Sequence, residues 1–324
     1  MQRRTLIQTA ATSIAFPHIW VPAQTLPAGP VRIIVGFPPG GGTDALARVV
    51  GQKLQMLWGV SVVVENKAGA AGVIAADYVS KQAGDGNTLL MGHINSHALA
   101  QAMGQKLNYD AVRDFAPISM VGITPMLLVC NTDQPAKTVK DIVALCKAKP
   151  GQISFASAGG GSAQQFALEM FKLQAGISAL HVPYRGSAPA LVDLIGGQVN
   201  YCFETSTSAA PHVLGGKAIA IAQTRLKRAK SFPNVPTMNE SGFKGYEATV
   251  WYGLMAPSKM PSVMQQRMND DVNKVLAMPE VQERMDFYGA EDGGGTIEKF
   301  ANFIKSEQQK WAVVAKAANV RADS

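Results

Sequence analysis

The sequence predicts an α/β protein with a layered architecture, and three observations predict it. Short β-branched runs alternate with segments of helical periodicity along most of the chain, which is typical of largely parallel sheets covered by helices. A strand, a run of three glycines, a hydroxyl residue and a helix occur in this order twice, once in each half. The length of 324 residues is sufficient for two domains of ordinary size.

The first of the two repeated segments occupies Val31–Arg48. Val31–Val35 is an apolar, β-branched run that predicts a buried strand, and three glycines follow at 40–42. Thr43 or Asp44 is a suitable N-cap for the helix that comes next. Such a turn leaves N–H groups free at the positive end of a helix dipole, where a carboxylate or phosphate binds well. The alternative is a tight turn into a packed helix.

The second segment begins with the alternating strand Gln152–Ser157 and continues through the run AGGGS at 158–162 into another helix. If both helix N-termini face one cleft, they form an anion clamp with one jaw in each half of the chain. Two unrelated turns are the alternative interpretation.

The other elements follow the same two periodicities, with a turn predicted at 185–187. Strands are predicted over 60–65, 88–92, 115–120, 126–131, 180–184, 199–203 and 218–223. Helices are predicted over 72–83, 138–148, 188–194, 264–276, 281–287 and 297–317.

Two polar segments, His93–Ser96 and Glu204–Ser208, are predicted as loops that directly follow strands. Because open α/β sheets bind ligands at the carboxyl ends of their strands, both loops are candidate walls of a site. For His93–Ser96 the alternative is a capped loop before a helix from His97. The pair Trp251-Tyr252 either faces the cleft or packs in the core, and core packing is the commoner arrangement.

Met1–Ala23 has the features of an export signal. Positive charge at Arg3 and Arg4, an apolar middle and small residues at the end predict cleavage near Ala23. The arginine pair partly matches a twin-arginine signal, so the Sec and twin-arginine routes both stay open. No later apolar run is long enough to span a bilayer, so the mature chain is expected to be soluble and exported.

The net charge of +7 falls to +5 when the two leader arginines are removed. The remaining excess is scattered, apart from a basic cluster over 225–230 that contains no aromatic residue. Such a cluster is typical of a solvated loop, so no nucleic-acid partner is expected.

Three cysteines, Cys130, Cys146 and Cys202, have apolar neighbours and no CxxC spacing. Buried reduced thiols are expected, although an exported protein would permit one bridge. His93-x-x-x-His97 is the nearest approach to a metal motif, and it lacks the glutamate of zinc proteases. We therefore expect no metal and no cofactor.

Seven segments between Pro30 and Ala318 together resemble one known family. They are VRIIVGFPPGGGTDALAR, VVVENKAGAAG, GDGNTLLMG, YDAVRDFAPIS, AKPGQISFASAGGGS, HVPYRGSAPALVDLIGGQV and FPNVPTMNESG, in this order. Each segment is weak alone, but the ordered set is very specific. The chain resembles the periplasmic substrate-binding proteins of tripartite tricarboxylate transporters, the Bug or TctC family.

The resemblance implies a two-lobed, Venus-flytrap periplasmic-binding-protein fold, type II-like, with a mixed, mostly parallel sheet in each lobe. Lobe 1 is expected to comprise 24–125 and 225–324, and lobe 2 is expected to comprise 126–224. The family implies a periplasmic, monomeric, non-enzymatic protein that captures a small carboxylated metabolite for integral-membrane transporter subunits.

The resemblance also implies a ligand held by two loops, Phe37–Asp44 and Ser157–Ser162. This chain departs from the family pattern at Gly160, Gln165 and Glu204-Thr205, where the family often has Asn, His and Asp-Asn. The expected ligand-binding residues are Phe37, Pro39, Gly40, Gly41, Thr43, Asp44, His93, Asn95, Ser96, Ser157, Ala158, Gly159, Gly160, Ser162, Gln165, Tyr184, Glu204 and Thr205.

The main alternative is an NAD(P)-dependent oxidoreductase. Gly40-x-Gly42-x-x-Ala45 follows a strand and Glu65 ends the next one, which fits a dinucleotide-binding fingerprint. Against it stand the negative charge of Asp44 near the expected pyrophosphate, the export signal, and the unexplained second glycine loop. A hydrolase is not supported, because no GxSxG elbow is present. A binding protein that serves a sensor instead of a transporter stays open.

Overall fold

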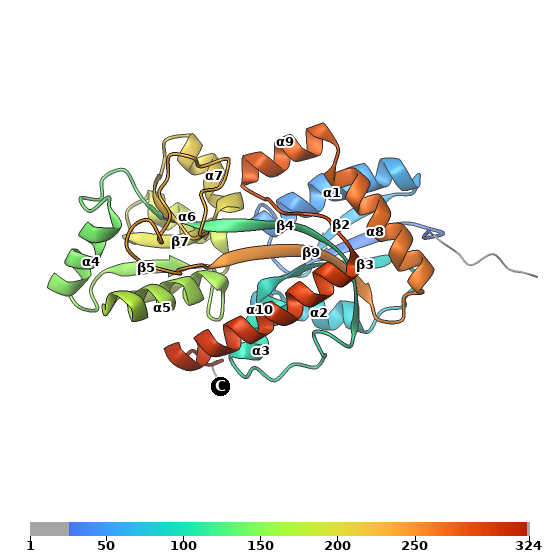
Figure 1. The fold of residues 1–324 in the computed structure, drawn as a ribbon, viewed down its shortest axis with the longest axis horizontal. Coiled ribbons are helices and arrows are strands. Elements are labelled where there is room, and N and C mark those ends of the chain that lie inside the picture. The colour runs from blue at the N-terminus through green and yellow to red at the C-terminus, as the bar shows by residue number, and fades with distance from the viewer. Residues whose placement is uncertain (1–25, 323–324) are drawn as a thin grey trace, which may run out of the picture.

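The computed structural model describes residues 26–322, so the predicted signal peptide lies outside the described residues (Figure 1). The strands are β1 Val31–Val35, β2 Val62–Asn66, β3 Thr88–His93, β4 Phe115–Cys130, β5 Ser154–Ser157, β6 Leu180–Pro183, β7 Tyr201–Thr205, β8 Ile219–Gln223 and β9 Thr249–Pro257. The helices are α1 Gly42–Trp58, η1 Ala70–Gly72, α2 Val73–Ser80, η2 Asn95–Leu99, α3 Ala100–Ala102, α4 Val139–Ala148, α5 Ala163–Ala175, α6 Ser187–Ile195, α7 Ser206–Leu214, α8 Ser262–Leu276, α9 Pro279–Tyr288 and α10 Ile297–Ala318.

The strands form one curled mixed sheet in the order β2-β1-β3-β9-β4-β7-β5-β6, with β8 also paired to β4. The first part of β4 pairs with β9, and its last five residues pair with β7 and β8. The first lobe is therefore built on β1, β2, β3, β9 and the start of β4, and the second on β5 to β8 and the end of β4. Figure 1 shows the two lobes side by side, with β4 and β9 running lengthwise between them.

The predicted α/β class and mixed sheets are confirmed. Four of the eight strand pairings in the described residues are parallel, so parallel pairing makes up half of the sheet and not most of it. The difference arises at β4, β8 and β9. These strands carry the chain between lobes, and all of their pairings are antiparallel.

The prediction of two separate strands over 115–120 and 126–131 is wrong. The structure has a single strand of 16 residues, and register shifts lie at Pro117/Ser119 and at Met120/Gly122. A bulge absorbs one extra residue without ending the pairing, so a proline and a glycine remain compatible with continuous pairing.

The prediction that His93–Ser96 and Glu204–Ser208 are loops is wrong, because both segments consist of a strand end and the start of a helix. His93 is the last residue of β3, and the helical turn η2 begins two residues later at Asn95. Glu204 and Thr205 likewise belong to β7, and α7 begins at Ser206 without a connecting loop. The polar side chains therefore sit on strand ends and first helical turns, whose backbone is fixed by hydrogen bonds.

The N-cap of α1 is Gly41, and not Thr43 or Asp44 as predicted. Thr43 and Asp44 lie inside the first turn, and the Asp44 carboxylate accepts from the Gly40 N–H, Arg48 and Asn66 instead of capping the helix, whose residues Leu46, Val50 and Leu54 are buried. This packing holds the glycine loop against the carboxyl end of β1.

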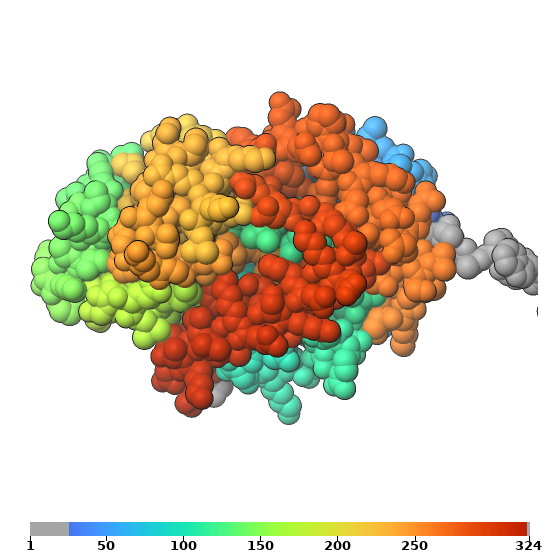
Figure 2. Space-filling model, viewed as in Figure 1, coloured from blue at the N-terminus to red at the C-terminus, as the bar shows by residue number. Residues whose placement is uncertain are grey.

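The C-terminal helix α10 packs on both lobes. It contacts η2, α3 and β4 of the first lobe and α5 of the second, where the rings of Trp311 and Phe166 lie 5.6 Å apart. In Figure 2 its red surface runs from the first lobe to the yellow-green surface of α5. The helix over 297–317 is confirmed, and its apolar residues Phe300, Ile304 and Trp311 are buried in the core. All three cysteines are buried and free, as predicted.

Candidate functional site

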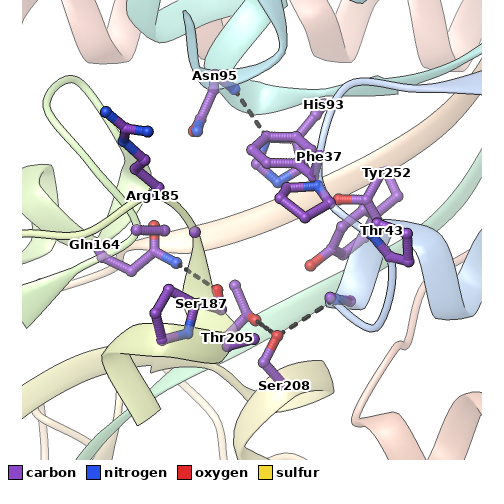
Figure 3. Close-up of a pocket in the computed structure, with 18 residues that line it drawn as sticks. Phe37, Thr43, His93, Asn95, Gln164, Arg185, Ser187, Thr205, Ser208 and Tyr252 are labelled. Atoms are coloured by element: carbon purple, nitrogen blue, oxygen red, sulfur yellow. Dashed lines mark hydrogen bonds between the residues drawn. The ribbon is translucent and has the colours of Figure 1, made fainter. Parts of the chain in front are cut away.

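A small cavity lies between the lobes at the first glycine loop, and we call it the inner cavity (Figure 3). Its volume is about 50 Å³. Eight of the predicted site residues line it: Phe37, Pro39, Gly41, Thr43, His93, Asn95, Ala158 and Thr205. Ten residues outside the prediction complete the lining: Pro38, Gly42, Gln164, Arg185, Gly186, Ser187, Ala188, Pro189, Ser208 and Tyr252.

Asp44 lies behind the first glycine loop and does not line the inner cavity. It accepts hydrogen bonds from the Gly40 N–H (3.1 Å) and the Asn66 amide (2.9 Å), and it pairs with Arg48 at 2.9 Å. Burial favours a higher pKa for Asp44, but the hydrogen bonds from Arg48, Asn66 and Gly40 outweigh it and lower the pKa. Its charge is thus compensated on the far side of the loop, which leaves the cavity side free for an anion.

Direct hydrogen bonds join the two lobes at the site. The first N–H of α1, at Gly42, donates to the Ser208 hydroxyl at 3.3 Å, and the Thr207 hydroxyl lies 3.2 Å from that of Tyr252. Asn95 Oδ1 accepts from the N–H of Ala163, the first residue of α5, at 3.1 Å. The lobes are therefore closed on each other around the inner cavity.

His93 contributes a neutral ring to the cavity wall, between Phe37 and Tyr252. The ring centroids lie 4.7 and 5.3 Å from those of the two neighbours. Burial, with a smaller contribution from His97, lowers the pKa of His93 to about 3. Its Nδ1 accepts from the Asn95 N–H at 3.1 Å, so the ring proton is on Nε2 and His93 is a neutral donor.

The second glycine loop contributes only Ala158 to the inner cavity. Ser157 hydrogen-bonds to His181, Ser162 caps α5, and Gln165 closes back onto the Gly161 N–H. The helix start that faces the cavity from the second lobe is that of α6, through Gly186, Ser187 and neighbours. The sequence did not predict this helix start as part of the site, because the turn at 185–187 contains one glycine and not a run of three.

The helices α1 and α6 share one feature at this cavity. Each has a glycine as its N-cap, Gly41 or Gly186, and neither cap residue makes a side-chain hydrogen bond to its helix. In contrast, Ser162 accepts from the N–H of Gln165 at the start of α5. Apart from the Gly42 N–H, which donates to Ser208, the positive ends of α1 and α6 are therefore left available on opposite walls of the inner cavity.

Glu204 is fully buried and stands behind the cavity wall without lining it. Its Oε1 accepts from Gln164 Nε2 at 3.1 Å, from the Ser187 hydroxyl at 2.9 Å and from the Thr205 N–H at 2.7 Å. Its Oε2 has no hydrogen-bond partner within residues 26–322. Burial raises the pKa of Glu204 despite these hydrogen bonds. It therefore positions three residues that do line the cavity.

Replacing Glu204 by glutamine should stabilise the protein at pH 8, and the gain should shrink toward pH 4.5. Because the folded state raises this pKa, the contribution of Glu204 to stability is complete below the unfolded value of 4.5 and is lost as pH rises through the folded value. Glutamine keeps the acceptor and cannot ionise. Urea unfolding at pH 5 and pH 8 measures the difference.

The matched variant Glu204→Leu should be about 1–3 kcal/mol less stable than the Glu204→Gln variant at both pH values. Leucine has no acceptor, so the buried donors of Gln164, Ser187 and Thr205 lose their partner. Equal gains of the glutamine variant at the two pH values would contradict a raised pKa.

Five other predicted residues also lie away from the inner cavity, and one of them is Gly40, whose N–H donates to Asp44. The Ser96 hydroxyl lies 2.9 Å from His97 Nδ1, inside the fold. Gly159, Gly160 and Tyr184 line a second, outer cavity of about 540 Å³. The two cavities share Phe37, Pro38, Ala158, Arg185 and Gly186.

The geometry does not support the dinucleotide alternative. The order β2-β1-β3 places β3 beside β1, whereas the dinucleotide fold places its third strand outside the second. Glu65, the residue expected to bind a ribose, pairs with Lys67 at 2.7 Å and Arg32 at 3.5 Å. Within the described part of the chain, no group of three His, Cys, Asp or Glu residues could hold a metal ion.

Comparisons with known proteins identify the family of the chain. The sequence profile of the family described as "Tripartite tricarboxylate transporter family receptor", TctC, matches residues 46–320. Protein BugT of Bordetella pertussis (strain Tohama I) is 37% identical over 313 residues, which are 96% of this chain and 95% of BugT.

Two solved structures share the fold. The periplasmic binding protein BugD has a TM-score of 0.86 and 34% identity, covering 92% of this chain and 100% of BugD. Rpa4515 of R. palustris, solved with adipate, has a TM-score of 0.88 and 31% identity, covering 91% and 99%. None of the helices in residues 26–322 has the length and apolar character to cross a bilayer. The protein has the two-lobed periplasmic-binding-protein fold and is a solute-binding protein, and the chain belongs to the TctC family of tripartite tricarboxylate transporter receptors.

Proposed function

We propose that this protein is a periplasmic receptor that captures a small carboxylate-bearing metabolite between its lobes for a tripartite tricarboxylate-type membrane transporter. The lobes comprise 24–125 with 225–324, and 126–224. The protein acts as a monomer, without a cofactor and without catalysis. Its predicted signal peptide directs export through the Sec or twin-arginine route, with cleavage near Ala23.

One observation carries the choice of a carboxylate. The N-termini of α1 and α6 come from opposite lobes, have glycines as N-caps, and both reach the inner cavity, where one N–H of α1, that of Gly42, already donates to Ser208. Backbone N–H groups at a helix start bind anions directly, so the site needs neither a metal ion nor a protonated side chain. His93, held neutral with its proton on Nε2, supports an acceptor such as a carboxylate oxygen.

The energetics require both lobes. One helix N-terminus contributes at most about 2 kcal/mol to an anion in a partly buried site. Micromolar affinity needs about 8 kcal/mol. The remainder has to come from the second helix, from bridging waters and from the apolar walls, which act together only when the lobes are closed. Ligand binding therefore stabilises the closed form that a membrane partner recognises.

A ligand screen by thermal shift and calorimetry on the mature chain, residues 24–324, tests the proposal. Adipate, succinate and hexanoate should stabilise the protein, by about 2.7 kcal/mol for a ligand at 100 times its dissociation constant. Adipamide, the uncharged analogue, should not. Stabilisation by NAD with none by any organic acid would refute the proposal.

A further inference from the structure

Arg185 differs from every other arginine in residues 26–322. Each of the others has a hydrogen bond, an ion pair or an aromatic ring as a partner, whereas the guanidinium of Arg185 has no such partner in the described chain. Arg185 is exposed, at the turn before α6. An arginine that the fold leaves unpaired beside a cavity is available to a ligand.

The position of Arg185 is the boundary between the inner and the outer cavity, because it lines both. Figure 3 shows it at the opposite end of the drawn site from Thr43 and Tyr252, on the side of Asn95. A group bound at the start of α1 and a group bound by Arg185 would therefore occupy different ends of one ligand.

The sizes of the cavities favour such a ligand. The inner cavity, about 50 Å³, has room for a few water molecules or a carboxylate group with its bridging water. The outer cavity, about 540 Å³, begins at the residues that both cavities share. A ligand that extends from the inner cavity into the outer one therefore passes the shared residues, Arg185 among them.

The charge around Arg185 is not compensated by the protein. Neither cavity has an aspartate or glutamate in its lining, and Arg185 is the one lysine or arginine that lines either of them among residues 26–322. Asp44 and Glu204, the nearest acids discussed above, lie behind the walls. The boundary between the cavities is thus electropositive and has no anion of its own.

We infer that Arg185 binds a second carboxylate, at the distal end of the ligand, and thereby selects dicarboxylates over monocarboxylates of equal length. The inference rests on the proposed function, which supplies the first carboxylate in the inner cavity. The planar guanidinium donates two parallel hydrogen bonds to a carboxylate, a geometry that lysine cannot reproduce. The linker between the two carboxylates lies along the shared apolar residues Phe37, Pro38 and Ala158.

Calorimetric titration with adipate and with its monoamide, adipamic acid, tests this inference on the mature chain. Adipate should bind the wild type at least tenfold more tightly than adipamic acid does. Arg185→Gln should lower adipate affinity 10- to 100-fold and leave adipamic acid within threefold, so that the preference disappears. Arg185→Lys should retain part of it. The control Lys217→Gln removes the same charge from an exposed turn and should change neither affinity.

The outcomes separate the two proposals. If both ligands bind the wild type equally, or if Arg185→Gln weakens both by the same factor, the role of Arg185 is overturned and the carboxylate receptor stands. If neither acid binds the wild type at any concentration up to the millimolar range, the proposed function fails and this inference fails with it.

Discussion

Replacing Gly42 by alanine should lower ligand affinity about 100-fold while the protein remains folded. A Cβ atom at this position would lie 1.8 Å from Thr207 Oγ1 and 2.5 Å from Thr207 Cβ. Thr207 belongs to α7 of the second lobe, and its hydroxyl is held by Thr205 and Tyr252, so it cannot rotate away without losing these two hydrogen bonds. The alanine therefore opposes closure and not helix formation. Isothermal calorimetry and circular dichroism measure the two effects separately.

The neighbouring glycine provides the matched control. A Cβ atom at Gly41 would have the Pro38 carbonyl oxygen as its nearest neighbour, at an ordinary 3.7 Å. Gly41→Ala should bind within a few-fold of the wild type. The double variant Gly42→Ala/Thr207→Gly, which removes both clashing atoms, should recover part of the affinity. A Gly42→Ala protein that binds as the wild type does would disprove the closure argument.

The free energy of unfolding should fall steeply as the pH is lowered below about 6.5, by up to about 3 kcal/mol per pH unit. Burial lowers the pKa of His93 and of His97 to about 3, whereas the value for an unfolded histidine is near 6.5. The folded state thus excludes two protons that the unfolded state binds. Their contribution is complete above pH 6.5 and is lost as pH falls toward 3, at about 1.4 kcal/mol per unit for each ring. Urea unfolding between pH 7.5 and 4.5 measures the slope.

The variant His97→Phe tests whether the buried histidines cause this pH dependence. The His97 ring packs at 4.7 Å from Phe115 and 6.3 Å from Trp251, surroundings that suit a phenyl ring. We expect the slope below pH 6 to fall by about half in His97→Phe. An unchanged slope in His97→Phe would mean that other groups govern acid unfolding.

The sequence predicts the first glycine loop well because its local signals agree. A buried strand, three glycines and a helix with a regular apolar stripe specify strand, turn and helix without help from distant residues. Six of its residues do line the cavity. The exact side-chain directions needed the tertiary structure. Asp44 suits an N-cap by residue type, but Arg48 and Asn66 draw it behind the loop.

The second wall could be predicted only in part. Glu204 and Thr205 are neighbours on β7, and neighbours on a strand face opposite sides, so only one of them can reach the cavity. That alternation was available in the sequence. Gln164 lines the cavity where Gln165 was expected, because one helical step rotates the side chain by about 100° and the start of α5 is set by Asn95 of the other lobe. No local pattern reports that contact.

The uninterrupted path of β4 has a consequence for how the molecule comes apart. Its first eleven residues complete the sheet of one lobe and its last five complete the sheet of the other, so neither lobe possesses a finished core when isolated. Cutting the chain at the crossover would strip a central strand from both halves at once. We therefore expect the two lobes, which move relative to each other when a ligand binds, to unfold together and not one after the other.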